Sequence, residues 1–364
     1  MRKEVKLGEI CDILNGYAFK SKEYVEDGIR IIRITNVQKG IIQDTDPKYY
    51  HIDKIETLKN YMLKENDLLI SLTGNVGRVG QISKDLLPAG LNQRVGCIRI
   101  KEKEDVSIDY LYQYFNSYNF ERDCINNSKG IAQKNLSTEW LKNYKIKIPS
   151  LNEQNRIAIE LRQIQRIKDL KQQQLKELEQ LIKSQFVEMF GDIYFNDKKW
   201  DKNKWKEILV IKNGKNQNRV ESFNGKYPIY GSGGVIGFAN DYICNENSVI
   251  IGRKGSINKP ILVKTKFWNV DTAFGLEPIE EKIKSDYLYY FCYFYNFEKH
   301  NKAVTIPSLT KKDLLNIVIP VPPLSLQNQF SEIVKQIDKQ KFEIEKSLKE
   351  TQELYESLME KYFG

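Results

Sequence analysis

Ile148-Pro149-Ser150-Leu151-Asn152-Glu153-Gln154 is the stretch on which the fold of this chain depends, because it occurs twice. It opens a long polar segment that ends at Met189-Phe190-Gly191, and Val321-Pro322-Pro323-Leu324-Ser325-Leu326-Gln327 opens a second one, which ends at Tyr362-Phe363-Gly364. Three matched pairs are each separated by 173 positions: Pro149 and Pro322, Gln154 and Gln327, and Gly191 and Gly364. A constant offset over the whole segment indicates an internal duplication.

Each copy predicts a long amphipathic helix. Proline fixes φ and lacks an N–H, so it ends a strand and can precede a helix. Apolar side chains then recur every three or four residues between Lys, Glu and Gln: Ile157, Leu161, Ile164, Ile167, Leu170, Leu175, Leu178, Ile182, Phe186 and Met189 in the first copy, and Phe330, Ile333, Ile337, Ile344, Leu348, Tyr355, Leu358 and Tyr362 in the second. One apolar seam on a charged helix is typical of a coiled coil. We therefore expect the two copies to pair, with Gly191 ending the first helix.

The composition favours an intracellular protein with a polyanionic partner. A chain of 364 residues is long enough for two or three domains. Lys and Arg number 57 against 48 Asp and Glu, and a formal net charge of +9 favours a partner such as nucleic acid. The five cysteines are odd in number and far apart, so neither a disulfide framework nor a zinc motif is indicated. Without an apolar run of membrane-spanning length or a signal peptide, we expect a cytoplasmic protein that contacts no membrane.

The segments outside the predicted helices are also related to each other. Leu7-Gly8-Glu9-Ile10 and Asn15-Gly16 match Trp205-Lys206-Glu207-Ile208 and Asn213-Gly214 at an offset of 198, and Asp109-Tyr110-Leu111-Tyr112 matches Asp286-Tyr287-Leu288-Tyr289 at an offset of 177. Because the offset shrinks along the chain, the two segments should share a scaffold and differ in loop length. We expect a domain at 1–148, a helix at 149–191, a domain at 192–320 and a helix at 321–364.

Each domain should have a mixed α/β (α+β) fold. Short β-branched runs bounded by turn residues predict strands at 29–34, 67–72, 96–100 and 144–148, and at 248–251, 260–263 and 316–319. A helix is predicted over 109–122, with Asp109 as its N-cap and Leu111, Tyr114, Phe115 and Tyr118 on one face, and another over 286–299. We expect the aromatic residues of these helices to belong to the core. The alternation of strands and helices is too irregular to predict a doubly wound parallel sheet.

The sequence contains no motif for catalysis. It lacks a Gly-x-x-x-x-Gly-Lys phosphate loop, and His51 and His300 are its only histidines, which argues against histidine-based metal or triad chemistry. An adenine methyltransferase would need an Asp/Asn-Pro-Pro-Tyr/Phe loop, but Pro322-Pro323 is followed by Leu324. Glu280-Glu281-Lys282 resembles the end of a nuclease motif without its acidic partner. We therefore expect neither catalytic residues nor a metal site.

Glycine-rich, basic loops at matching places in both domains are the candidate functional sites. The loop 72–80 follows one predicted strand, and its counterpart 251–259 follows another. Glycine allows a close approach of the backbone, and Arg, Lys, Asn and Thr can bond phosphates or base edges. The alternative is a tight turn with ordinary surface charges. The candidate DNA-binding residues of the first domain are Arg33, Thr35, Asn36, Thr73, Asn75, Arg78, Asn92, Gln93, Arg94, Lys129, Gln133 and Lys134. Those of the second domain are Asn216, Gln217, Arg219, Tyr230, Ser232, Arg253, Lys254, Asn258, Lys259 and Lys302.

These features together resemble the specificity (S) subunit of type I restriction-modification enzymes. The resemblance rests on the alternation of domain and helix, the Leu7-Gly8-Glu9-Ile10 opening, the Asn15-Gly16 turn, the Thr73-Gly74-Asn75-Val76-Gly77 loop and the Pro149-x-x-x-Glu153-Gln154 helix start. It covers essentially the whole chain. The sequence departs from the pattern at Leu326, which stands where the first copy has Glu153, and at Trp205-Lys206-Glu207-Ile208, which lacks the glycine. Both departures indicate that the two halves have diverged.

The resemblance implies two target-recognition domains, each of which reads one half of a bipartite, asymmetric DNA target. The two long helices would form an antiparallel coiled coil within an internal pseudo-twofold repeat. Two modification (M) subunits would carry S-adenosylmethionine and methylate adenine at N6, and two restriction (R) subunits would use ATP and Mg²⁺ for translocation and cleavage. This chain would bind double-stranded DNA, none of those cofactors and no membrane. A helix over 152–190 would span roughly 58 Å, or at most about 17 base pairs, and would fix the gap between the half-sites.

Two alternatives remain open from the sequence. A non-catalytic coiled-coil adaptor for other proteins would need the helices but would leave the paired basic loops without a purpose. A stand-alone DNA methyltransferase or nuclease is disfavoured by the missing motifs.

Overall fold

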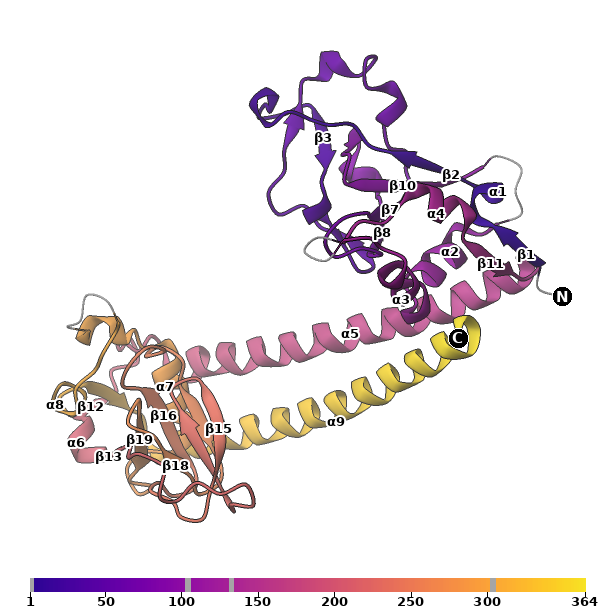
Figure 1. The fold of residues 1–364 in the computed structure, drawn as a ribbon. Coiled ribbons are helices and arrows are strands. Elements are labelled where there is room, and N and C mark those ends of the chain that lie inside the picture. The colour runs from indigo at the N-terminus through magenta and orange to yellow at the C-terminus, as the bar shows by residue number, and fades with distance from the viewer. Residues whose placement is uncertain (1–2, 102–105, 131–133, 302–305) are drawn as a thin grey trace. The chain divides into compact units, whose positions relative to one another are not determined.

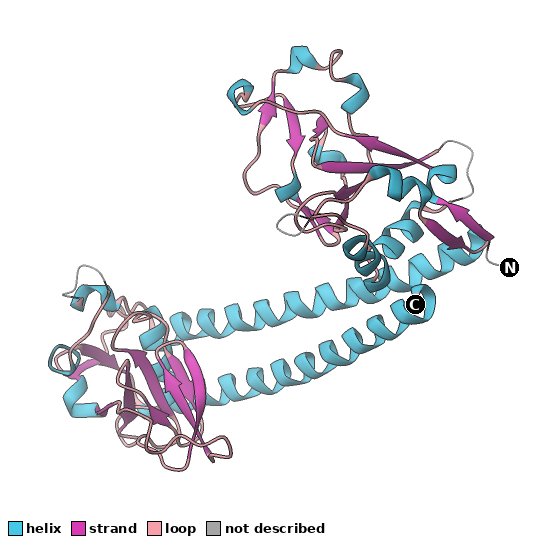
Figure 2. Cartoon of the chain, in the orientation of Figure 1, coloured by secondary structure: helices cyan, strands magenta, loops and turns pink. Residues whose placement is uncertain are grey.

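The computed structural model describes residues 3–101, 106–130, 134–301 and 306–364 (Figure 1). By their contacts these residues form two compact units. Unit 1 comprises Met1–Leu170 with Leu348–Gly364, and unit 2 comprises Lys171–Ser347. Both units contain helices and strands, which confirms the predicted mixed α/β fold (Figure 2).

Two long helices contribute to both units. Helix α5 (Leu151–Phe190) and helix α9 (Leu324–Phe363) each have 40 residues. In unit 1, Lys168 of α5 lies 4.7 Å from the ring centroid of Tyr355 of α9, and Arg156 donates to the Tyr362 hydroxyl at 3.5 Å. Arg156 precedes Lys168 in α5, whereas its partner Tyr362 follows Tyr355 in α9. The two helices therefore run antiparallel, which confirms the predicted coiled coil.

The same antiparallel pairing holds in unit 2. Glu179 of α5 forms an ion pair with Lys341 of α9 at 3.5 Å, and the rings of Phe186 and Phe330 lie 5.6 Å apart. Gly191 follows α5 with φ +78°, the conformation that ends a helix, as expected. The predicted seam is not buried throughout, however, because Ile167 and Leu170 are exposed.

Unit 1 contains a four-stranded antiparallel sheet and a smaller three-stranded sheet. The order in the four-stranded sheet is β2-β10-β7-β8, and in the three-stranded sheet β6-β3-β9. Their bounds are Cys11–Asn15 (β2), Val95–Ile100 (β10), Leu68–Ser71 (β7), Val79–Gln81 (β8), Tyr49–Tyr50 (β6), Ile29–Ile32 (β3) and Ala89–Leu91 (β9). Its other described strands and α-helices are β1 (Lys3–Lys6) paired with β11 (Lys145–Ile148), the hairpin β4 (Val37–Gln38) and β5 (Ile41–Ile42), and the helices α1 (Leu7–Ile10), α2 (Ile108–Phe115), α3 (Tyr118–Asn126) and α4 (Thr138–Asn143).

Unit 2 repeats this topology. Its four-stranded antiparallel sheet has the order β13-β19-β16-β17, and its three-stranded sheet has the order β15-β14-β18. Their bounds are Leu209–Asn213 (β13), Ala273–Pro278 (β19), Ser248–Gly252 (β16), Ile261–Val263 (β17), Gly234–Ala239 (β15), Tyr227–Gly231 (β14) and Trp268–Asn269 (β18). The remaining elements are β12 (Asp201–Lys204) paired with β20 (Val318–Val321), and the helices α6 (Trp205–Ile208), α7 (Ser285–Phe294) and α8 (Lys311–Leu314). The correspondence of strand orders confirms the internal repeat.

The repeated glutamine explains why the Pro-x-x-x-x-Gln stretch decides the fold. Gln154 is buried, its Nε2 donates to the carbonyl of Pro149 at 3.0 Å, and its Oε1 accepts from the N–H of Ser107 at 2.8 Å. Gln327 does the same with the carbonyl of Pro322 at 2.7 Å and the N–H of Lys284 at 2.8 Å. Each glutamine therefore ties the start of a long helix to the residue that precedes α2 or α7.

Aromatic residues at the end of each long helix complete the core of a unit. The ring of Phe363 lies 5.5 Å from that of Tyr110 in unit 1, and the ring of Phe190 lies 4.8 Å from that of Tyr287 in unit 2. Tyr110 and Tyr287 are buried, and the Tyr287 hydroxyl donates to the carbonyl of Pro320 at 2.6 Å. Most of the aromatic residues predicted for the core are buried in it or packed against it, but Tyr118 and Tyr293 are exposed.

Several predicted elements differ from the structure, among them the strand expected over 29–34, which ends at Ile32 and is followed by a 3₁₀ helix over Ile34–Asn36. The helix expected over 109–122 is broken, because the Ser117 side chain accepts the N–H of Phe120 and starts α3; the N-cap of α2 is Ser107, not Asp109, and Tyr118 is exposed. The helix expected over 286–299 ends at Phe294, and Asn296 caps a separate short 3₁₀ helix at Phe297–His300. The strand expected over 316–319 starts at Val318, since the N–H groups of Asn316 and Ile317 donate to the carbonyls of Asp313 and Leu314 in α8.

Candidate nucleic-acid interface

The loop 72–80 of unit 1 joins β7 to β8 and has a backbone fixed by internal bonds. Gly74 and Gly77 have φ of +69° and +83°, backbone angles that residues with a side chain rarely adopt. A Cβ on Gly77 would lie 2.7 Å from the Cβ of Cys124. The Ser71 hydroxyl donates to the carbonyl of Asn75 at 2.6 Å and accepts the N–H of Arg78 at 3.0 Å. The loop therefore presents Asn75 and Arg78 from a rigid turn.

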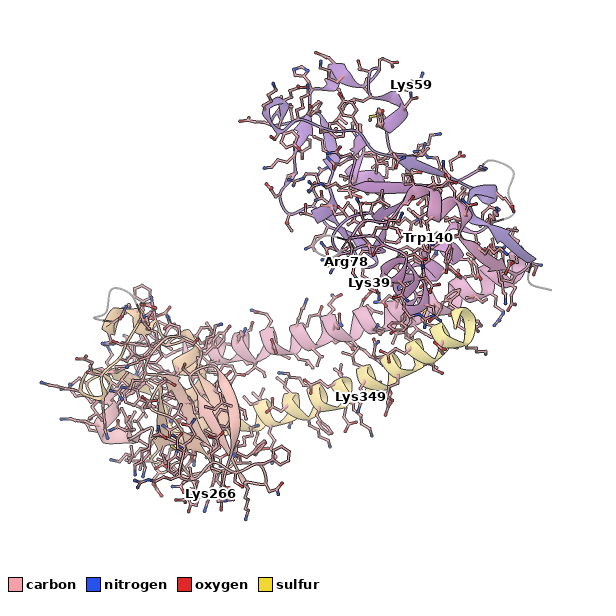
Figure 3. All side chains as sticks on the ribbon, viewed as in Figure 1. Lys39, Lys59, Arg78, Trp140, Lys266 and Lys349 are labelled. Carbon is pink, nitrogen blue, oxygen red and sulfur yellow. The ribbon has the colours of Figure 1, made fainter. Side chains whose placement is uncertain are left out.

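Five predicted residues of unit 1 line one concavity of about 450 Å³: Thr35, Thr73, Asn75, Arg78 and Arg94. They come from three separate segments of the chain. Gln38 and Ser71 line the same concavity. Arg78 Nη1 donates to Gln38 Oε1 at 2.7 Å, and Gln38 Nε2 donates to the carbonyl of Thr35 at 2.9 Å. The guanidinium of Arg78, which Figure 3 labels in unit 1, is thus held in place by Gln38.

A second basic segment is bonded to this loop. The N–H of Gly74 donates to the carbonyl of Lys134 at 2.9 Å, and Thr73 forms a β-bridge with Asn135. Lys129 exchanges backbone hydrogen bonds with Asn135, so the exposed side chains of Lys129 and Lys134 lie near the 72–80 loop. The predicted residue Gln133 lies outside the described residues.

Other predicted residues of unit 1 have partners within the protein. Asn36 is buried, and its side chain bonds the N–H of Arg33, the carbonyl of Gln43 and the carboxylate of Asp44. The Arg33 guanidinium lies 3.4 Å from the carboxylate of Asp46, whose pKa is lowered by hydrogen bonds from Lys48 and from Arg33. These contacts give Asn36 a structural role and direct Arg33 towards Asp46.

In the segment 92–94 the backbone is bonded to the rest of unit 1, whereas two side chains are exposed. Asn92 Oδ1 accepts the N–H of Arg94 at 3.3 Å, and Gln93 donates its N–H to the carbonyl of Tyr17 at 2.9 Å. The side chains of Gln93 and Arg94 are exposed. This segment can therefore present two side chains without moving its backbone.

The loop 251–259 of unit 2 repeats the backbone bonds of 72–80. The N–H of Gly255, whose φ is +79°, donates to the carbonyl of Pro307 at 3.0 Å, as Gly74 does to Lys134. Lys254 forms a β-bridge with Ser308, as Thr73 does with Asn135. Gly74 and Gly255 are therefore equivalent, and counting from them makes Lys259 the counterpart of Arg78 and Arg253 the counterpart of Leu72. Arg78 and Arg253 do not occupy equivalent positions.

Three predicted residues of unit 2 lie close together. The Arg253 N–H donates to the carbonyl of Thr272 at 2.8 Å, and its guanidinium lies 5.9 Å from the ring centroid of Phe274. Lys254 is exposed beside it. Ser232 Oγ lies 4.0 Å from the position that a Cβ would take on Gly255. The turn after β14 and the loop after β16 therefore form one surface.

The remaining predicted residues of unit 2 are not part of this group. The side chain of Asn258 bonds the N–H of Phe297 at 2.8 Å and Asn296 Oδ1 at 3.4 Å. Tyr230 packs on Phe267 with ring centroids 5.5 Å apart, and burial raises its pKa. Lys259 is exposed, and Lys302 lies outside the described residues.

Asn216, Gln217 and Arg219 belong to a segment at the other end of β15. The backbone carbonyl of Gln217 accepts hydrogen bonds from the N–H groups of Val220 and Glu221, each at 2.9 Å. Glu221 forms a β-bridge with Ala239, the last residue of β15. Asn216 Oδ1 accepts the N–H of Asn218 at 2.9 Å, and Arg219 is exposed. The structure does not bring this segment to Ser232, which follows β14 at the opposite end of the hairpin.

Sequence reasoning missed two polar residues of these surfaces. Gln38 follows the predicted residues Thr35 and Asn36 by only a few positions, but nothing in the sequence shows that it bonds Arg78. Thr272 precedes β19 as Arg94 precedes β10, and each carbonyl accepts an N–H from the neighbouring loop. Aligning the two domains around these strands could have identified Thr272.

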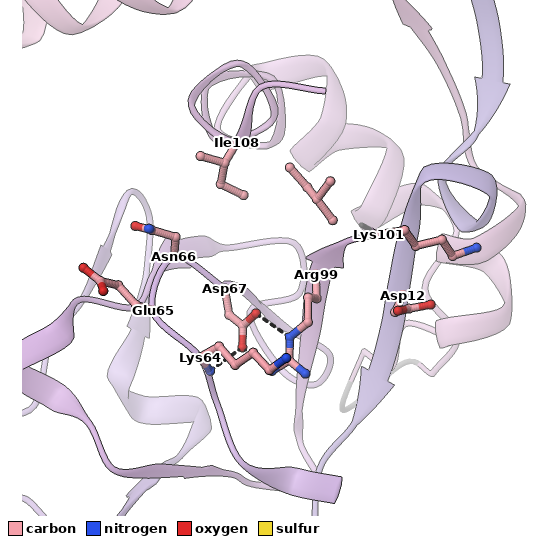
Figure 4. A pocket seen from close by; sticks show the side chains of 9 residues that line it. Asp12, Lys64, Glu65, Asn66, Asp67, Arg99, Lys101 and Ile108 are labelled. Atoms are coloured by element: carbon pink, nitrogen blue, oxygen red, sulfur yellow. Dashed lines mark hydrogen bonds and ion pairs between the residues drawn. The ribbon is translucent and has the colours of Figure 1, made fainter. Parts of the chain in front are cut away.

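A separate concavity of about 560 Å³ in unit 1 contains none of the predicted residues (Figure 4). Its central feature is an ion pair, in which Arg99 Nε and Nη2 donate to the two oxygens of the buried Asp67 at 2.8 and 2.6 Å. The hydrogen bond to Asp67 raises the pKa of Arg99. Because Arg99 is on β10 and Asp67 immediately precedes β7, this pair joins neighbouring strands and serves the scaffold.

Among residues 3–101, 106–130, 134–301 and 306–364, no three His, Cys, Asp or Glu side chains are grouped so that they could hold a metal ion. In those same ranges, no helix combines the length and the apolar character that crossing a membrane requires.

Known proteins share both the sequence and the fold of this chain. Curated relatives include the type I restriction enzyme EcoAI specificity subunit of Escherichia coli, 33% identical over 156 residues, and the MjaVIII specificity subunit of Methanocaldococcus jannaschii, 31% identical over 180 residues. These alignments span 42% and 48% of this chain, but only 26% and 42% of the relatives. The putative MjaX specificity subunit of the same archaeon is 22% identical, and the alignment covers 96% of this chain and 91% of that protein.

Two solved structures show the fold over the full length. The S subunit of a type I restriction-modification system from M. genitalium matches with a TM-score of 0.64 and 17% identity, covering 100% of this chain and 96% of that one. A chain from a study of the assembly and conformational transition of the type I R-M system matches with a TM-score of 0.61 and 18% identity, covering 100% and 97%. The family model described as the type I restriction modification DNA specificity domain matches residues 2–180 and again 197–354. The chain therefore belongs to the family of type I restriction-modification specificity proteins, which recognise DNA and are not themselves catalytic, and it contains two specificity domains.

Proposed function

We propose that this chain selects the DNA target of a type I restriction-modification complex. The domains at 1–148 and 192–320 would each read one half of a bipartite, asymmetric target. The helices at 149–191 and 321–364 would keep the gap between the half-sites fixed. The observation that carries this proposal is the pair of loops 72–80 and 251–259, which share a backbone framework and differ in the side chains they expose.

The side chains of unit 1 suit contact with both phosphates and bases. An arginine can donate two hydrogen bonds to guanine, and an asparagine can bond adenine, so Arg78 and Asn75 are the proposed base readers of the concavity. Lys129 and Lys134 are exposed beside it and would bind phosphates, which makes affinity fall as salt rises. In unit 2, contacts with bases and phosphates would come from Ser232, Arg253, Lys254 and Lys259.

The proposed partners supply the chemistry. Two M subunits with S-adenosylmethionine would methylate adenine at N6, and two R subunits with ATP and Mg²⁺ would translocate and cleave DNA. This chain would bind none of these cofactors itself and would act in the cytoplasm. The support comes from the curated relatives, which are named as specificity subunits of type I restriction enzymes.

Co-expression of this chain with a candidate M subunit in a host without DNA methylation tests the proposal. Sequencing of the genome for N6-methyladenine should reveal a two-part motif with a fixed gap, and the motif should be absent without this chain. A stable complex with M that modifies no motif would contradict the proposal and favour a protein adaptor. Methylation by the purified chain alone would instead indicate a stand-alone enzyme.

A further inference from the structure

The hairpin of β14 and β15 in unit 2 exposes three apolar side chains, Val235, Ile236 and Phe238, and the first two lie nearest its turn, beside the proposed reading loops. Tyr230 is paired with Val235 and Ile229 with Gly237, so Ile236 is the extra residue of a β-bulge. A bulge re-aims the side chain it carries. Val235 and Ile236 are 53% and 55% exposed. An isoleucine held this way at a hairpin end is available to a ligand.

Several distances place Ile236 next to the polar reading surface of unit 2. The position that a Cβ would take on Gly231 lies 3.7 Å from Ile236 Cγ2 and 3.8 Å from Thr272 Oγ1. The neighbouring Ser232 reaches the Gly255 turn, and Arg253 bonds the carbonyl of Thr272. Ile236 therefore belongs to the same surface as Ser232, Arg253 and Lys254.

Building on the proposed function, we propose that Ile236, with Val235 beside it, contacts the 5-methyl group of thymine in the half-site read by unit 2. The major groove admits a two-stranded β-ribbon, and thymine presents there a methyl group that apolar side chains contact. This surface combines that apolar pair with Lys254 and Arg253, whose charges suit the phosphates that line the groove. The carboxylate of Glu221 lies 3.0 Å from the Cβ position of Gly237, one residue further from the hairpin turn than Ile236.

The corresponding part of unit 1 has a different chemistry. Strand β3 is equivalent to β14, since each pairs in parallel with a neighbouring strand, β9 or β18. After β3, however, the chain forms the β4–β5 hairpin, which carries Gln38 to Arg78. That hairpin also carries an exposed isoleucine, Ile41, so the expectation for Ile236 concerns the half-site read by unit 2.

The test uses the complex with the M subunit and the target found from its methylation motif. Duplexes in which each thymine in turn is replaced by uracil lack one methyl group. We expect uracil at one or two positions, all in the half-site read by unit 2, to weaken binding of the duplex about fourfold, which corresponds to one buried methyl group. Ile236→Ala should bind the thymine duplex about fourfold more weakly and should no longer distinguish uracil at that position. Val318→Ala, which shortens an equally exposed strand residue of unit 2, should leave both measurements unchanged.

The outcomes separate this inference from the proposed function. A methylated motif whose affinity is insensitive to every uracil substitution would overturn the inference alone. So would a uracil effect that persists undiminished in both Ile236→Ala and Val235→Ala. Loss of the M subunit from Ile236→Ala would also overturn the inference, because it would show that the hairpin binds protein. Absence of any motif would overturn the proposed function and this inference with it.

Discussion

The loop after β7 in unit 1 and the loop after β16 in unit 2 have the same backbone bonds but different side chains. Gly74 and Gly255 both adopt positive φ and both donate to a carbonyl of a distant segment, and Val76 and Ile257 are both buried at the next apolar position. At the equivalent polar positions, which are partly or fully exposed, unit 1 has Asn75 and Arg78 where unit 2 has Ser256 and Lys259. The duplication has therefore kept the groups that shape the loop and changed those that face outwards.

The hairpins beside these loops differ even more. In unit 1, β4 and β5 bring Gln38 to Arg78, and the Tyr112 hydroxyl donates to the carbonyl of Gly40 in the hairpin turn at 2.6 Å. In unit 2, β14 turns directly into β15 and exposes Ile236. Two scaffolds of one topology thus present different side chains from the hairpin beside the loop: Gln38 and the exposed Ile41 in unit 1, and Val235 and Ile236 in unit 2. Two unlike half-sites are the expected consequence.

Breaking the shared scaffold should have the largest effect. Phe190→Ala removes a ring that contacts Phe186, Tyr287 and Phe330, and should lower the free energy of unfolding by about 3–5 kcal/mol. Phe363→Ala, the matched change in unit 1, should cost a similar amount because its ring contacts Tyr110 and Tyr114. Amide hydrogen exchange should accelerate in β16 and β19 for the first variant and in β7 and β10 for the second. Uniform acceleration in both units for either variant would show that the cores are not independent.

Charge reversal should weaken DNA binding to a different extent in the two loops. Arg78→Glu removes a proposed base contact and adds a repulsive charge, so DNA affinity should fall by about 100-fold, the upper range for one arginine–guanine contact. Lys259→Glu is the structural match in unit 2 and should mainly affect phosphate binding, with a loss of about tenfold and a weaker dependence on salt. Titration of DNA at several salt concentrations measures both. An unchanged affinity for Arg78→Glu, with assembly intact, would rule out the proposed role of the loop.

The sequence predicted the repeat well and the reading surface only in part. The repeat could be found because the constraints on it are local: proline before a helix, glutamine at a fixed spacing and apolar residues at helical intervals. Asn36 and Asn258 have the same side-chain chemistry as Asn75, yet Asn36 is buried and Asn258 is bonded to Asn296 and Phe297. Which asparagine faces outwards depends on tertiary contacts. The break at Ser117 was missed because the apolar spacing continues across it, while the serine hydroxyl competes for the N–H of Phe120.

The repeated glutamines offer a matched test of what the duplication has kept. Gln154→Ala and Gln327→Ala should each lower the free energy of unfolding by about 1–3 kcal/mol, since the N–H of Ser107 or Lys284 and the carbonyl of Pro149 or Pro322 would lose a buried partner. Chemical denaturation of both variants measures the loss. Gln93→Ala, which shortens an exposed glutamine, is the control and should change stability little. A clear difference between Gln154 and Gln327 would show that only one copy still depends on the motif.

The smallest expected effect isolates a contact that only unit 1 has. Gln38→Ala removes the acceptor of Arg78 Nη1, but the guanidinium remains at the concavity. Because a hydrogen bond to a charged group contributes about 1.5–3 kcal/mol when both partners are in place, and DNA can replace part of it, we expect about a fivefold loss of affinity. The loss should be confined to one position of one half-site, where other bases become tolerated, because a loosened arginine still carries its charge. Competition with duplexes mutated at single positions distinguishes this from a general loss of binding. An even loss across both half-sites would mean that Gln38 supports the fold of the β4–β5 hairpin and does not orient Arg78.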